Sequence, residues 1–554
     1  MPPWVGSGCK QRREATAGCN GVATSPINFN PSAVLIVIDR RLAGKTVLGR
    51  INSDTKSVYS VAMAKIETFA SLDPATGLEV GRYPNTSQEE VFQIVDNAKL
   101  ASKPWAAIGF AKRKKIMLNW AALLTKEFEV GAALIKSETG KPLGDARLEI
   151  SLAISHIAWA AKNAGRILAI QSRPSGILMF NMSAKVQRTP YGVVGVIGPW
   201  NYPAFTPIGS ITYALAAGNT VVFKPSEFTP GVGAWLSETF KRVAPFSDIF
   251  TTITGLPETG KALTESAIDK ISFTGSTKTA KLVGQSCAAR MIPFVLECGG
   301  KDPVLIDEDA SLNLAAENTL WSAMSNSGQS CIGAERVYVH REVADKFIKI
   351  ITQMASDLKP GAIEGDSYGP ATMPSQLKII AAHIKDAADS GAKFLLGGTD
   401  SVHEKYVDPV IMCDVPENST AVTEETFGPT LVINRVSDMD EAIQLSNATR
   451  YGLGASVWSR RNGEKIASKL HCGMVSINSV FLFAAIASIP FGGIKDSGNG
   501  RIHGAEGLLE FTYPRTIVRP MFKIPIAFTT FKRTEFANKF IIKLVKMLHG
   551  HKRR

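Results

Sequence analysis

Apolar residues follow two different periodicities along this chain. Between about residues 88 and 170 they recur every three or four positions in sequence rich in Ala and Lys, which predicts helices such as 88–101 and 111–128. From Tyr191 onward the pattern changes to short β-branched runs separated by helical stretches. The runs are residues 192–198, 220–223, 250–254 and 270–274. Strands that are apolar throughout are buried on both faces, and the helices between them supply crossovers, so the pattern predicts a doubly wound parallel sheet.

A second alternation of strands and helices runs from about residue 298 to residue 478. Its strands are predicted at 336–340, 430–434 and 474–478. The chain has 554 residues, more than one hydrophobic core usually serves, so at least two domains are expected. The predicted fold class is α/β, with two parallel-sheet domains that meet near Glu297.

The formal net charge of +13 is concentrated at the two ends of the chain. Residues 515–554 carry eleven Lys and Arg against one acidic residue, and residues 1–62 carry eight basic and three acidic side chains. The ends therefore hold +10 and +5, which leaves −2 for residues 63–514. Because nucleic-acid binding requires a basic face on the folded body, this distribution disfavours nucleic acid as a partner.

The first 62 residues follow neither periodicity. They mix Gly, Ser, Asn and Arg around one apolar run of six residues, 33–38, which is too short to cross a bilayer and lacks the order of a secretory signal. We expect residues 1–62 to be disordered or absent from the working protein, with Met63 as its start. Seven scattered cysteines form no CxxC pair and no metal-ligand spacing, so we expect no metal and a reducing, cytoplasmic location.

The last residues of the chain combine an apolar stripe with basic side chains. The apolar positions recur at helical spacing and are Phe536, Phe540, Ile541, Leu544, Val545 and Leu548. Lys539, Lys543 and Lys546 fall largely on the other face. A basic amphipathic helix can lie on an anionic membrane surface as a peripheral contact. The alternative is that residues 536–554 pack against the protein's own body or a neighbouring subunit, and the sequence leaves both interpretations open.

Two segments carry residue types suited to covalent chemistry on an aldehyde. Cys331 ends a polar, glycine-containing stretch, and Glu297 ends an apolar strand just before a Gly-Gly turn. A thiol nucleophile and a carboxylate base that folding brings together are what the covalent oxidation of an aldehyde requires. A lone cysteine is more often a buried and inert thiol, and Cys298 lies directly beside Glu297, so residue type alone does not identify the nucleophile.

The motifs around these residues carry a family resemblance. Pro-Trp-Asn (199–201), Leu-Glu-Cys-Gly-Gly-Lys (296–301), Gly-Gln-Ser-Cys (328–331) and Pro-Phe-Gly-Gly (490–493) occur in this order. With them the chain resembles the aldehyde dehydrogenase superfamily, in its non-acylating type, over most of its length. The resemblance implies that Cys331 is the nucleophile and that Glu297 is the base that activates the hydrolytic water. It also implies that Asn201 and the backbone N–H of Cys331 stabilise an oxyanion.

The resemblance also implies a domain organisation and an oligomer. It adds a small β extension, with strands near 178–190 and 508–519 that join subunits into a homodimer or homotetramer. The expected segments are the N-terminal helices and cofactor domain (63–297), the catalytic domain (298–488), a return to the cofactor domain with an oligomerisation strand (489–519), and a basic tail (520–554).

The cofactor positions rest on the resemblance, because the chain has no GxGxxG dinucleotide motif. Phe-Lys-Pro-Ser-Glu (223–227) at a strand end and Phe-Thr-Gly-Ser-Thr (273–277) at a helix start take its place. The implied contacts to NAD are Ile197, Pro199, Trp200, Lys224, Ser226, Glu227, Gly275, Ser276, Glu425 and Phe427. N–H groups at a helix start suit a pyrophosphate oxygen. A carboxylate at Glu227 accepts from a free 2′-OH and repels a 2′-phosphate, so NAD is favoured over NADP.

Two positions depart from the family pattern. Ala280 stands where relatives commonly carry Gly. Its added methyl group could narrow the approach of the dinucleotide to the helix, and we expect this change to be tolerated rather than to abolish cofactor binding. Ile502 follows Arg501 where many relatives have a Glu that is thought to take part in a proton relay. The simplest expectation for the next residue, His503, is a surface position.

The substrate is predicted from residues at the family's tunnel positions. Tyr202, Phe205, Ile332 and residues 480–486 are largely apolar, and no arginine stands beside these motifs to hold a carboxylate. We therefore expect aliphatic or aromatic aldehydes rather than semialdehydes. The alternative is that these side chains belong to the core.

Two other functions compete with hydrolytic aldehyde oxidation. In acylating oxidation, coenzyme A rather than water takes the acyl group, and Glu297 disfavours this because its role is to activate water. The chain could instead be a catalytically idle, membrane-associated binding protein that uses its basic tail. The presence of Cys331, Glu297 and Asn201 together argues against an idle site.

Overall fold

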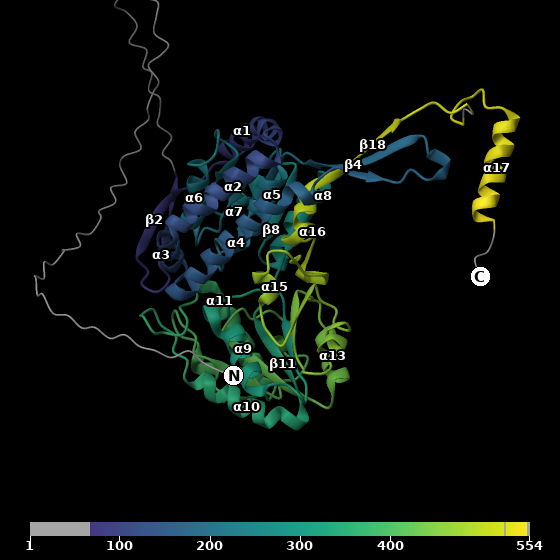
Figure 1. Ribbon diagram of the computed structural model, residues 1–554. Helices are drawn as coiled ribbons and strands as arrows, with labels where there is room; N and C mark the ends of the chain where they lie inside the picture. The colour runs from purple at the N-terminus through teal and green to yellow at the C-terminus, as the bar shows by residue number, and fades with distance from the viewer. Residues whose placement is uncertain (1–66, 526–527, 551–554) are drawn as a thin grey trace, which may run out of the picture. The chain divides into compact units, whose positions relative to one another are not determined.

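The computed structural model describes residues 67–525 and 528–550 (Figure 1). The expectations for residues 1–62 and for a start at Met63 lie outside the described residues. A short antiparallel hairpin of β1 (Thr68–Leu72) and β2 (Glu79–Pro84) opens the described part. Two large, mostly parallel sheets and one smaller antiparallel sheet follow.

The first large sheet has six strands in the order β17-β9-β8-β5-β6-β7. They are β5 (Val193–Ile197), β6 (Thr220–Lys224), β7 (Phe250–Thr252), β8 (Lys270–Thr274), β9 (Phe294–Glu297) and β17 (Gly498–Asn499). All neighbours are parallel except β17 and β9. The chain adds β6 and β7 on one side of β5 and then places β8 and β9 on the other side. The order therefore reverses between β5 and β8, and ligands of doubly wound sheets bind at such a reversal, outside the carboxyl ends of the strands.

Helices cover both faces of this sheet because successive strand residues point to opposite sides. Val193 and Val222 belong to a core shared with α1, α7 and α8, whereas Val194 and Val221 belong to a core shared with α2, α4, α5 and α6. The helices of this region are α1 (Gln88–Ala107), α2 (Gly109–Lys126), α3 (Phe128–Thr139), α4 (Leu143–Ile167), α5 (Phe205–Ala217), α6 (Pro230–Lys241), α7 (Pro257–Glu265), α8 (Thr277–Ala289) and α16 (Gly504–Glu510). The first sheet is thus a buried middle layer.

The second large sheet has seven strands in the order β12-β13-β14-β11-β10-β15-β16, parallel except at β12. Its strands are β10 (Asp302–Ile306), β11 (Ala334–His340), β12 (Lys393–Leu396), β13 (Val410–Cys413), β14 (Thr430–Val436), β15 (Gly454–Trp458) and β16 (Met474–Ile477). Its helices are α9 (Leu312–Met324), α10 (Arg341–Ser356), α11 (Pro374–Asp389), α12 (Thr420–Thr423), α13 (Met439–Asn447), α14 (Gly463–Ala467) and α15 (Leu482–Ala485). The chain passes from the first sheet to the second between Glu297 and Asp302.

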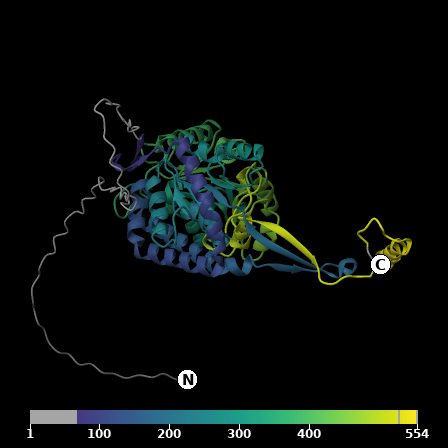
Figure 2. The same cartoon turned by 90° about the horizontal axis from the view of Figure 1, so that it is seen from above.

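The third sheet forms an arm. It contains β3 (Gln171–Arg173), β4 (Met182–Pro190) and β18 (Thr512–Pro520), in the order β18-β4-β3. In Figures 1 and 2, β4 and β18 extend away from the two large sheets. β18 is an edge strand and is exposed at every residue after Thr512. The one remaining helix of the described residues, α17 (Glu535–His549), follows this arm in the sequence.

Most of the elements predicted from periodicity are present. The predicted strands correspond to β5, β6, β7, β8, β11, β14 and β16, and the two predicted helices correspond to α1 and α2. α1 extends past its predicted end at residue 101 to Ala107 and includes Pro104. Trp105 explains the extension, because its ring is fully buried and its Nε1 donates to the carbonyl of Leu215 in α5 at 3.1 Å.

Candidate active site

Cys331 lies on a constrained loop between α9 and β11. Just before it, Ser325–Gly328 form a 3-10 turn, η2, in which Asn326 (φ 52°) and Ser327 (φ 58°) hold left-handed conformations. Gly328 also has a positive φ of 68°, and a β-carbon there would lie 2.1 Å from the carbonyl oxygen of Gly428. Non-glycine residues stay in this region only where their surroundings hold them. The packing of this turn therefore defines the position of Cys331.

Glu297 is the last residue of β9 and is almost fully buried. Neither of its carboxyl oxygens has a hydrogen-bond partner among the described residues. The 490–493 loop covers it, since a β-carbon on Gly492 would lie 2.7 Å from its Oε1. Burial raises the pKa of Glu297 well above its ordinary value, and the nearby guanidinium of Arg501 partly opposes this. A raised pKa makes the carboxylate a stronger base, as a catalytic proton acceptor requires.

Glu297 and Cys331 line the same cavity, whose volume is about 260 Å³. The wall is mostly apolar and includes Leu152, Tyr202, Phe205, Trp321, Ile332, Val480, Phe481, Leu482, Phe491 and Ile502. Most of the predicted tunnel residues are therefore in the wall, but Phe483 and Ile486 are not. The lining, which lies entirely within the described residues, contains no Lys or Arg, and it includes the carboxylates of Asp145 and Glu149. The cavity thus has no cationic group for a substrate carboxylate.

Two thiols line this cavity and differ in exposure. Cys331 is half-buried, whereas Cys298 is buried at 5% exposure. Burial raises the pKa of the Cys331 thiol far above its ordinary value, and the carboxylates of Glu425, Asp302 and Glu297 raise it further. Burial also raises the pKa of Cys298, to about 12. Both thiols are therefore protonated at neutral pH, and a nucleophilic thiolate would require a base in the site.

Asn201 lies on the loop between β5 and α5, beside the nucleophile loop. Its side-chain Nδ2 donates to the carbonyl of Gln329, two residues before Cys331, at 2.9 Å. Asn326 donates in turn to the backbone carbonyl of Asn201 at 3.1 Å. A side-chain amide has two N–H groups, so the bond to Gln329 leaves one that a substrate oxygen could use.

A buried ion pair holds the Asn201 loop in place. Lys141 Nζ donates to the carbonyl of Asn201 at 2.7 Å and pairs with Glu149 Oε2 at 2.8 Å. The other oxygen of Glu149 accepts from the backbone N–H groups of Ala204 and Phe205 at 2.8 and 3.1 Å. Both side chains of the pair are fully buried, so the loop is attached to α4 through charges that cannot turn to solvent.

Glu425 and Phe427 lie on the loop between α12 and β14. Glu425 Oε1 accepts from the N–H of Gly300 at 3.3 Å, and a β-carbon on Gly299 would overlap the same carboxylate at 2.1 Å. Burial, together with the neighbouring Glu335, raises the pKa of Glu425 to about 8. The ring of Phe427 meets that of Trp200 edge-on at 5.6 Å. Glu425 therefore lies against the Gly299-Gly300 turn, and Phe427 lies against Trp200.

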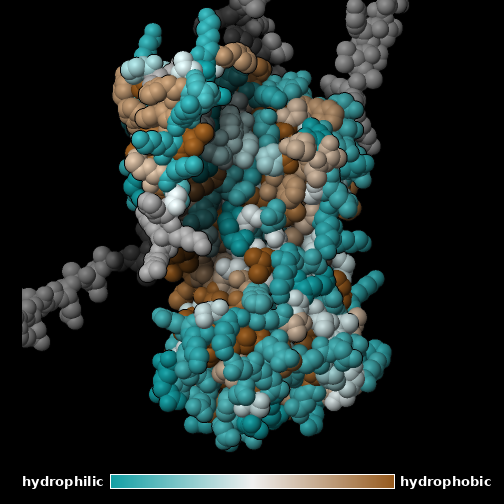
Figure 3. Space-filling view, turned by 90° about the vertical axis from the view of Figure 1, so that its right-hand side faces the viewer, coloured by the Kyte–Doolittle hydropathy of each residue, from teal (hydrophilic) through white to brown (hydrophobic). Residues whose placement is uncertain are grey.

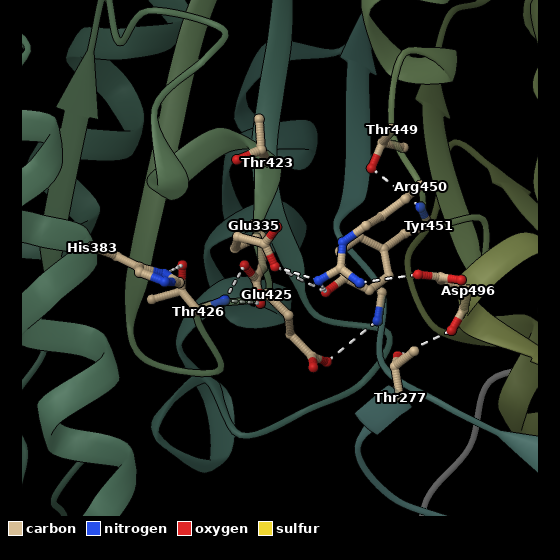
Figure 4. Close-up of polar contacts among 12 residues, drawn as sticks. Thr277, Glu335, His383, Thr423, Glu425, Thr426, Thr449, Arg450, Tyr451 and Asp496 are labelled. Carbon is tan, nitrogen blue, oxygen red and sulfur yellow. Dashed lines mark hydrogen bonds and ion pairs between the residues drawn. The ribbon is translucent and has the colours of Figure 1, made fainter. Parts of the chain in front are cut away.

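Glu335 anchors this loop, as Figure 4 shows. Its carboxylate accepts from the N–H groups of Thr426, at 2.8 Å, and Phe427, at 3.1 Å, and it forms a buried ion pair with Lys301. Lys301 also donates to Thr426 Oγ1 at 3.1 Å. Burial lowers the pKa of Lys301, and the Glu335 carboxylate opposes the shift. Lys301 and Glu335 thus tie β10 and β11 to the loop that carries Glu425.

The remaining predicted cofactor residues lie along the carboxyl edge of the first sheet. β5 ends at Ile197 and is followed by Pro199, and β6 ends at Lys224 and is followed by Ser226 and Glu227. β8 is followed by Gly275 and Ser276. Glu227 is half-buried, with its Oε2 3.5 Å from Lys224 Nζ and 3.3 Å from Ser226 Oγ. Ser276 caps α8 by accepting from the N–H of Thr279.

This edge fits a dinucleotide. A β-carbon on Gly275 would lie 2.8 Å from the ring of Phe273, so the turn into α8 has room only for glycine. The start of α8 supplies backbone N–H groups at the point where the strand order reverses. Glu227 places a half-buried carboxylate beside the adjacent strand end, and a carboxylate is a group that can accept from hydroxyls.

The structure places both departures from the family pattern. Ala280 is only 2% exposed and packs in the core with Phe273 and Val283. His503 is not a surface residue but is 1% exposed and lines the cavity. Its ring lies 4.1 Å from that of His156, and none of the four ring nitrogens has a hydrogen-bond partner among the described residues. Burial lowers the pKa of His156 to about 4, so this histidine is neutral at physiological pH.

Sequence reasoning missed several residues that hold the site together. Glu335 and Arg336 could have been found, because two adjacent charged residues at the start of an apolar strand are expected to be buried with partners of opposite charge. Lys141 and Glu149 could not, because their spacing does not differ from that of solvent-facing helix residues. The contacts of all four depend on segments distant in the sequence.

Comparisons with known proteins identify sequences and solved structures that are similar to this chain. A sequence model of the Aldehyde dehydrogenase family matches residues 61–517. The 4,4′-diapolycopene aldehyde oxidase of Methylomonas sp is 35% identical over 451 residues, which cover 81% of this chain and 85% of that protein. The NADP(+)-dependent succinate-semialdehyde dehydrogenase of Escherichia coli (strain K12) is 34% identical, with coverage of 81% and 94%. The solved NAD+ complex of an aldehyde dehydrogenase from Bacillus cereus has a TM-score of 0.79 and 31% identity, over 82% of this chain and 94% of that chain.

Proposed function

Because the chain belongs to the aldehyde dehydrogenase family, whose members are oxidoreductases acting on aldehydes, we propose that it oxidises an apolar aldehyde to the carboxylic acid with NAD. The observation that carries the proposal is the shared cavity of Cys331 and Glu297, with its apolar wall. The proposed substrates are aliphatic or aromatic aldehydes.

The proposed reaction begins at the Cys331 thiol. The thiol transfers its proton to a base, and its sulfur attacks the carbonyl carbon to form a thiohemiacetal. Loss of a hydride from this carbon leaves a thioester, and addition of water releases the acid and regenerates the thiol. Bound NAD supplies the hydride acceptor. Glu297 is the proposed base for the water, because its unpaired carboxyl lies in the same cavity and burial raises its pKa.

Asn201 is the proposed oxyanion donor, together with the backbone N–H of Cys331. Its position supports this role, because its side chain bonds to Gln329 on the nucleophile loop. The Lys141–Glu149 pair, which holds the Asn201 loop, would keep the donor in place before substrate arrives. Removing one donor of this kind typically lowers kcat about 10²–10³-fold.

NAD is proposed over NADP because of Glu227. A carboxylate at the ribose end accepts hydrogen bonds from a free 2′-OH and repels a 2′-phosphate. Relatives differ in this property, since one is named as an NADP(+)-dependent enzyme and another was solved with NAD+. The proposed contacts are Ile197, Pro199, Trp200, Lys224, Ser226, Glu227, Gly275, Ser276, Glu425 and Phe427.

An apolar substrate is proposed because the cavity lacks a cation. A semialdehyde would bring its carboxylate towards Asp145 and Glu149 with no Lys or Arg among the lining residues to receive it. Burial raises the pKa of Asp145, the Lys141 cation opposes this shift, and Glu149 adds to it. Desolvation at this part of the wall therefore opposes added negative charge. An apolar aldehyde avoids that cost.

We further propose that the enzyme is a cytoplasmic homodimer or homotetramer. The exposed edge of β18 supports this, because an unpaired edge strand is a ready site for pairing with another chain. Peripheral contact with a membrane through residues 536–554 is also proposed.

Initial rates of NADH formation test the reaction. Purified wild type, Cys331→Ala and the matched control Cys298→Ala would be compared on hexanal, benzaldehyde and succinic semialdehyde, with NAD or NADP and with or without coenzyme A. We expect turnover with the first two aldehydes, without coenzyme A, that is lost in Cys331→Ala and kept in Cys298→Ala. Strict dependence on coenzyme A, preference for the semialdehyde, or full activity of Cys331→Ala would each overturn part of the proposal.

A further inference from the structure

α17 is an amphipathic helix that forms from local signals. Thr534 caps it by accepting from the N–H of Ala537, the acidic Glu535 lies in the first turn, and Lys546 and His549 lie in the last turn, as the helix dipole favours. At ~100° per residue, eight of its apolar residues fall within one half of the helix. These are Phe536, Ala537, Phe540, Ile541, Leu544, Val545, Met547 and Leu548. The other half carries the polar and basic residues, with Ile542 as the one apolar exception.

Most of the large side chains on the apolar half of α17 are exposed within the described residues, while Ile541 and Leu544 are half-buried. Ala537 is its only buried residue. Phe536 is 65% exposed and Met547 is 63% exposed, and Phe531, just before the helix, is fully exposed. The interpretation that this stripe packs against the chain's own body therefore has no support from the described residues. A contiguous exposed apolar surface marks a site of contact with another molecule or a membrane.

The charge around this apolar half is strongly positive. Lys532, Arg533, Lys539, Lys543 and Lys546 lie within residues 528–550 against the single carboxylate of Glu535. Lys523 adds one more positive charge before the helix. A partner that buries phenylalanine and leucine beside so many cations must be apolar within and anionic at its surface, which describes the headgroup and acyl boundary of an anionic bilayer.

The tip of the arm adds a second apolar element to the same part of the chain. Ile177, Phe180, Met521 and Phe522 are each about half exposed. The rings of Phe180 and Phe522 lie 5.7 Å apart, and Asn181 donates to the carbonyl of Phe522 at 3.2 Å. The segment that leads to α17 thus starts from an apolar tip. Figure 3, which faces the arm side, shows apolar surface among hydrophilic surface there.

The length of α17 sets the kind of membrane contact. Its 15 residues span about 22 Å at ~1.5 Å per residue, less than the ~30 Å hydrocarbon core of a bilayer. No helix within residues 67–525 and 528–550 is long and apolar enough to cross a membrane. The family match ends at residue 517, so α17 is an addition beyond the catalytic fold.

We propose that α17, with the apolar arm tip before it, is a docking surface that lies in the plane of an anionic bilayer. The helix would bury its apolar half at the headgroup and acyl boundary and place its lysines among lipid phosphates and carboxylates. An apolar aldehyde partitions into the same lipid, so docking would bring the cavity of the proposed enzyme close to its substrate. The docking itself does not depend on the proposed reaction, and only this last consequence rests on it.

Vesicle flotation of the full-length protein tests the surface. Vesicles of phosphatidylcholine alone would be compared with vesicles that contain phosphatidylserine, at low and high salt. We expect binding only to the anionic vesicles, with a loss of at least about 10-fold at high salt, since exposed charges are screened. A triple variant with Lys539→Gln, Lys543→Gln and Lys546→Gln should weaken vesicle binding about 100-fold, because each lysine contributes about 1 kcal/mol to binding. Phe536→Glu with Phe540→Glu should abolish it.

The matched control is Leu100→Glu on α1, which alters a side chain that is 78% exposed but lies away from this surface. It should bind vesicles as wild type does. Light scattering would report the oligomeric mass of every variant, and hexanal oxidation would report the catalytic fold. Equal binding to neutral vesicles, no binding to either kind, or unchanged binding by the lysine variant would overturn the proposal. If the phenylalanine variant loses oligomeric mass, the occupant is a second copy of the chain and the proposal is also overturned.

Discussion

Replacing Glu335 by alanine would leave the ammonium group of Lys301 buried without its counter-ion. The two side chains are 7% and 1% exposed, and Glu335 also accepts from the N–H groups of Thr426 and Phe427. Breaking a buried pair at one partner costs about 3–5 kcal/mol, because the remaining charge is neither solvated nor paired. Each orphaned N–H group adds about 1–3 kcal/mol. We expect Glu335→Ala to lower the free energy of unfolding by at least about 3 kcal/mol.

A double-mutant cycle isolates the ion pair from these added losses. Lys301→Met, Glu335→Gln and the double variant would be unfolded in urea at one fixed protein concentration. The double variant removes both charges together. We therefore expect its loss in the free energy of unfolding to be at least about 2 kcal/mol smaller than the sum of the losses in the two single variants. The KM for NAD should rise in Glu335→Gln, since the loop that carries Glu425 loses one of its anchors.

The control for the cycle is Asp389→Ala, which breaks the surface pair with Lys385. Its two side chains are more than half exposed, so the expected cost is below about 1 kcal/mol. If the losses of the two single variants add up to that of the double variant within about 0.5 kcal/mol, the ion pair does not stabilise the fold as proposed. A cost of Glu335→Ala no larger than that of Asp389→Ala would refute the reasoning as well.

Three further predictions concern the nucleophile loop, the buried histidines and the cofactor. Gly328→Ala should lower kcat about 10²-fold in steady-state assays, because its β-carbon would meet the carbonyl of Gly428 at 2.1 Å and displace Cys331. Gly391→Ala, at a positive φ but in open space, should leave kcat unchanged, and an equal loss in both variants would contradict this. Burial lowers the pKa of His156 from 6.5 to about 4. As the pH falls, the unfolded chain therefore binds a proton at this histidine before the folded chain does. The free energy of unfolding should fall between these two pKa values, by up to about 3 kcal/mol. Thermal unfolding at pH 7 and pH 5 should show a smaller loss for His156→Phe, and an unchanged loss would exclude this role. Glu227→Ser should raise the ratio of kcat/KM for NADP over NAD at least about 10-fold, and an unchanged ratio would remove Glu227 from cofactor selection.

The wrong expectation for His503 has a physical cause. His503 was expected at the surface from its neighbours in the sequence, but its burial depends on a segment far from it. His503 packs against His156 of α4. Spacing along the chain reports which residues share a helix face, but not which element covers that face.

The secondary-structure elements and the identities of the reactive groups could be predicted from the amino-acid sequence. Strands such as β5 and β8 were predictable because their uniform apolarity reflects burial on both faces, and α17 was predictable because its apolar spacing and cap are local. The motifs around Cys331 and Glu297 were also visible, since the chemistry requires those residue types.

The placement of the reactive groups, and the contacts that hold them, depend on how the chain folds. The fold brings Glu297, at the end of β9 in the first sheet, and Cys331, on the loop before β11 of the second sheet, to one cavity. It also places Lys141 and Glu335 where they hold the surrounding loops. A buried charge can be stable only beside its partner, and that partner lies on another segment of the chain. Such pairings leave no periodic trace in a single sequence, so they became visible only once the chain was folded.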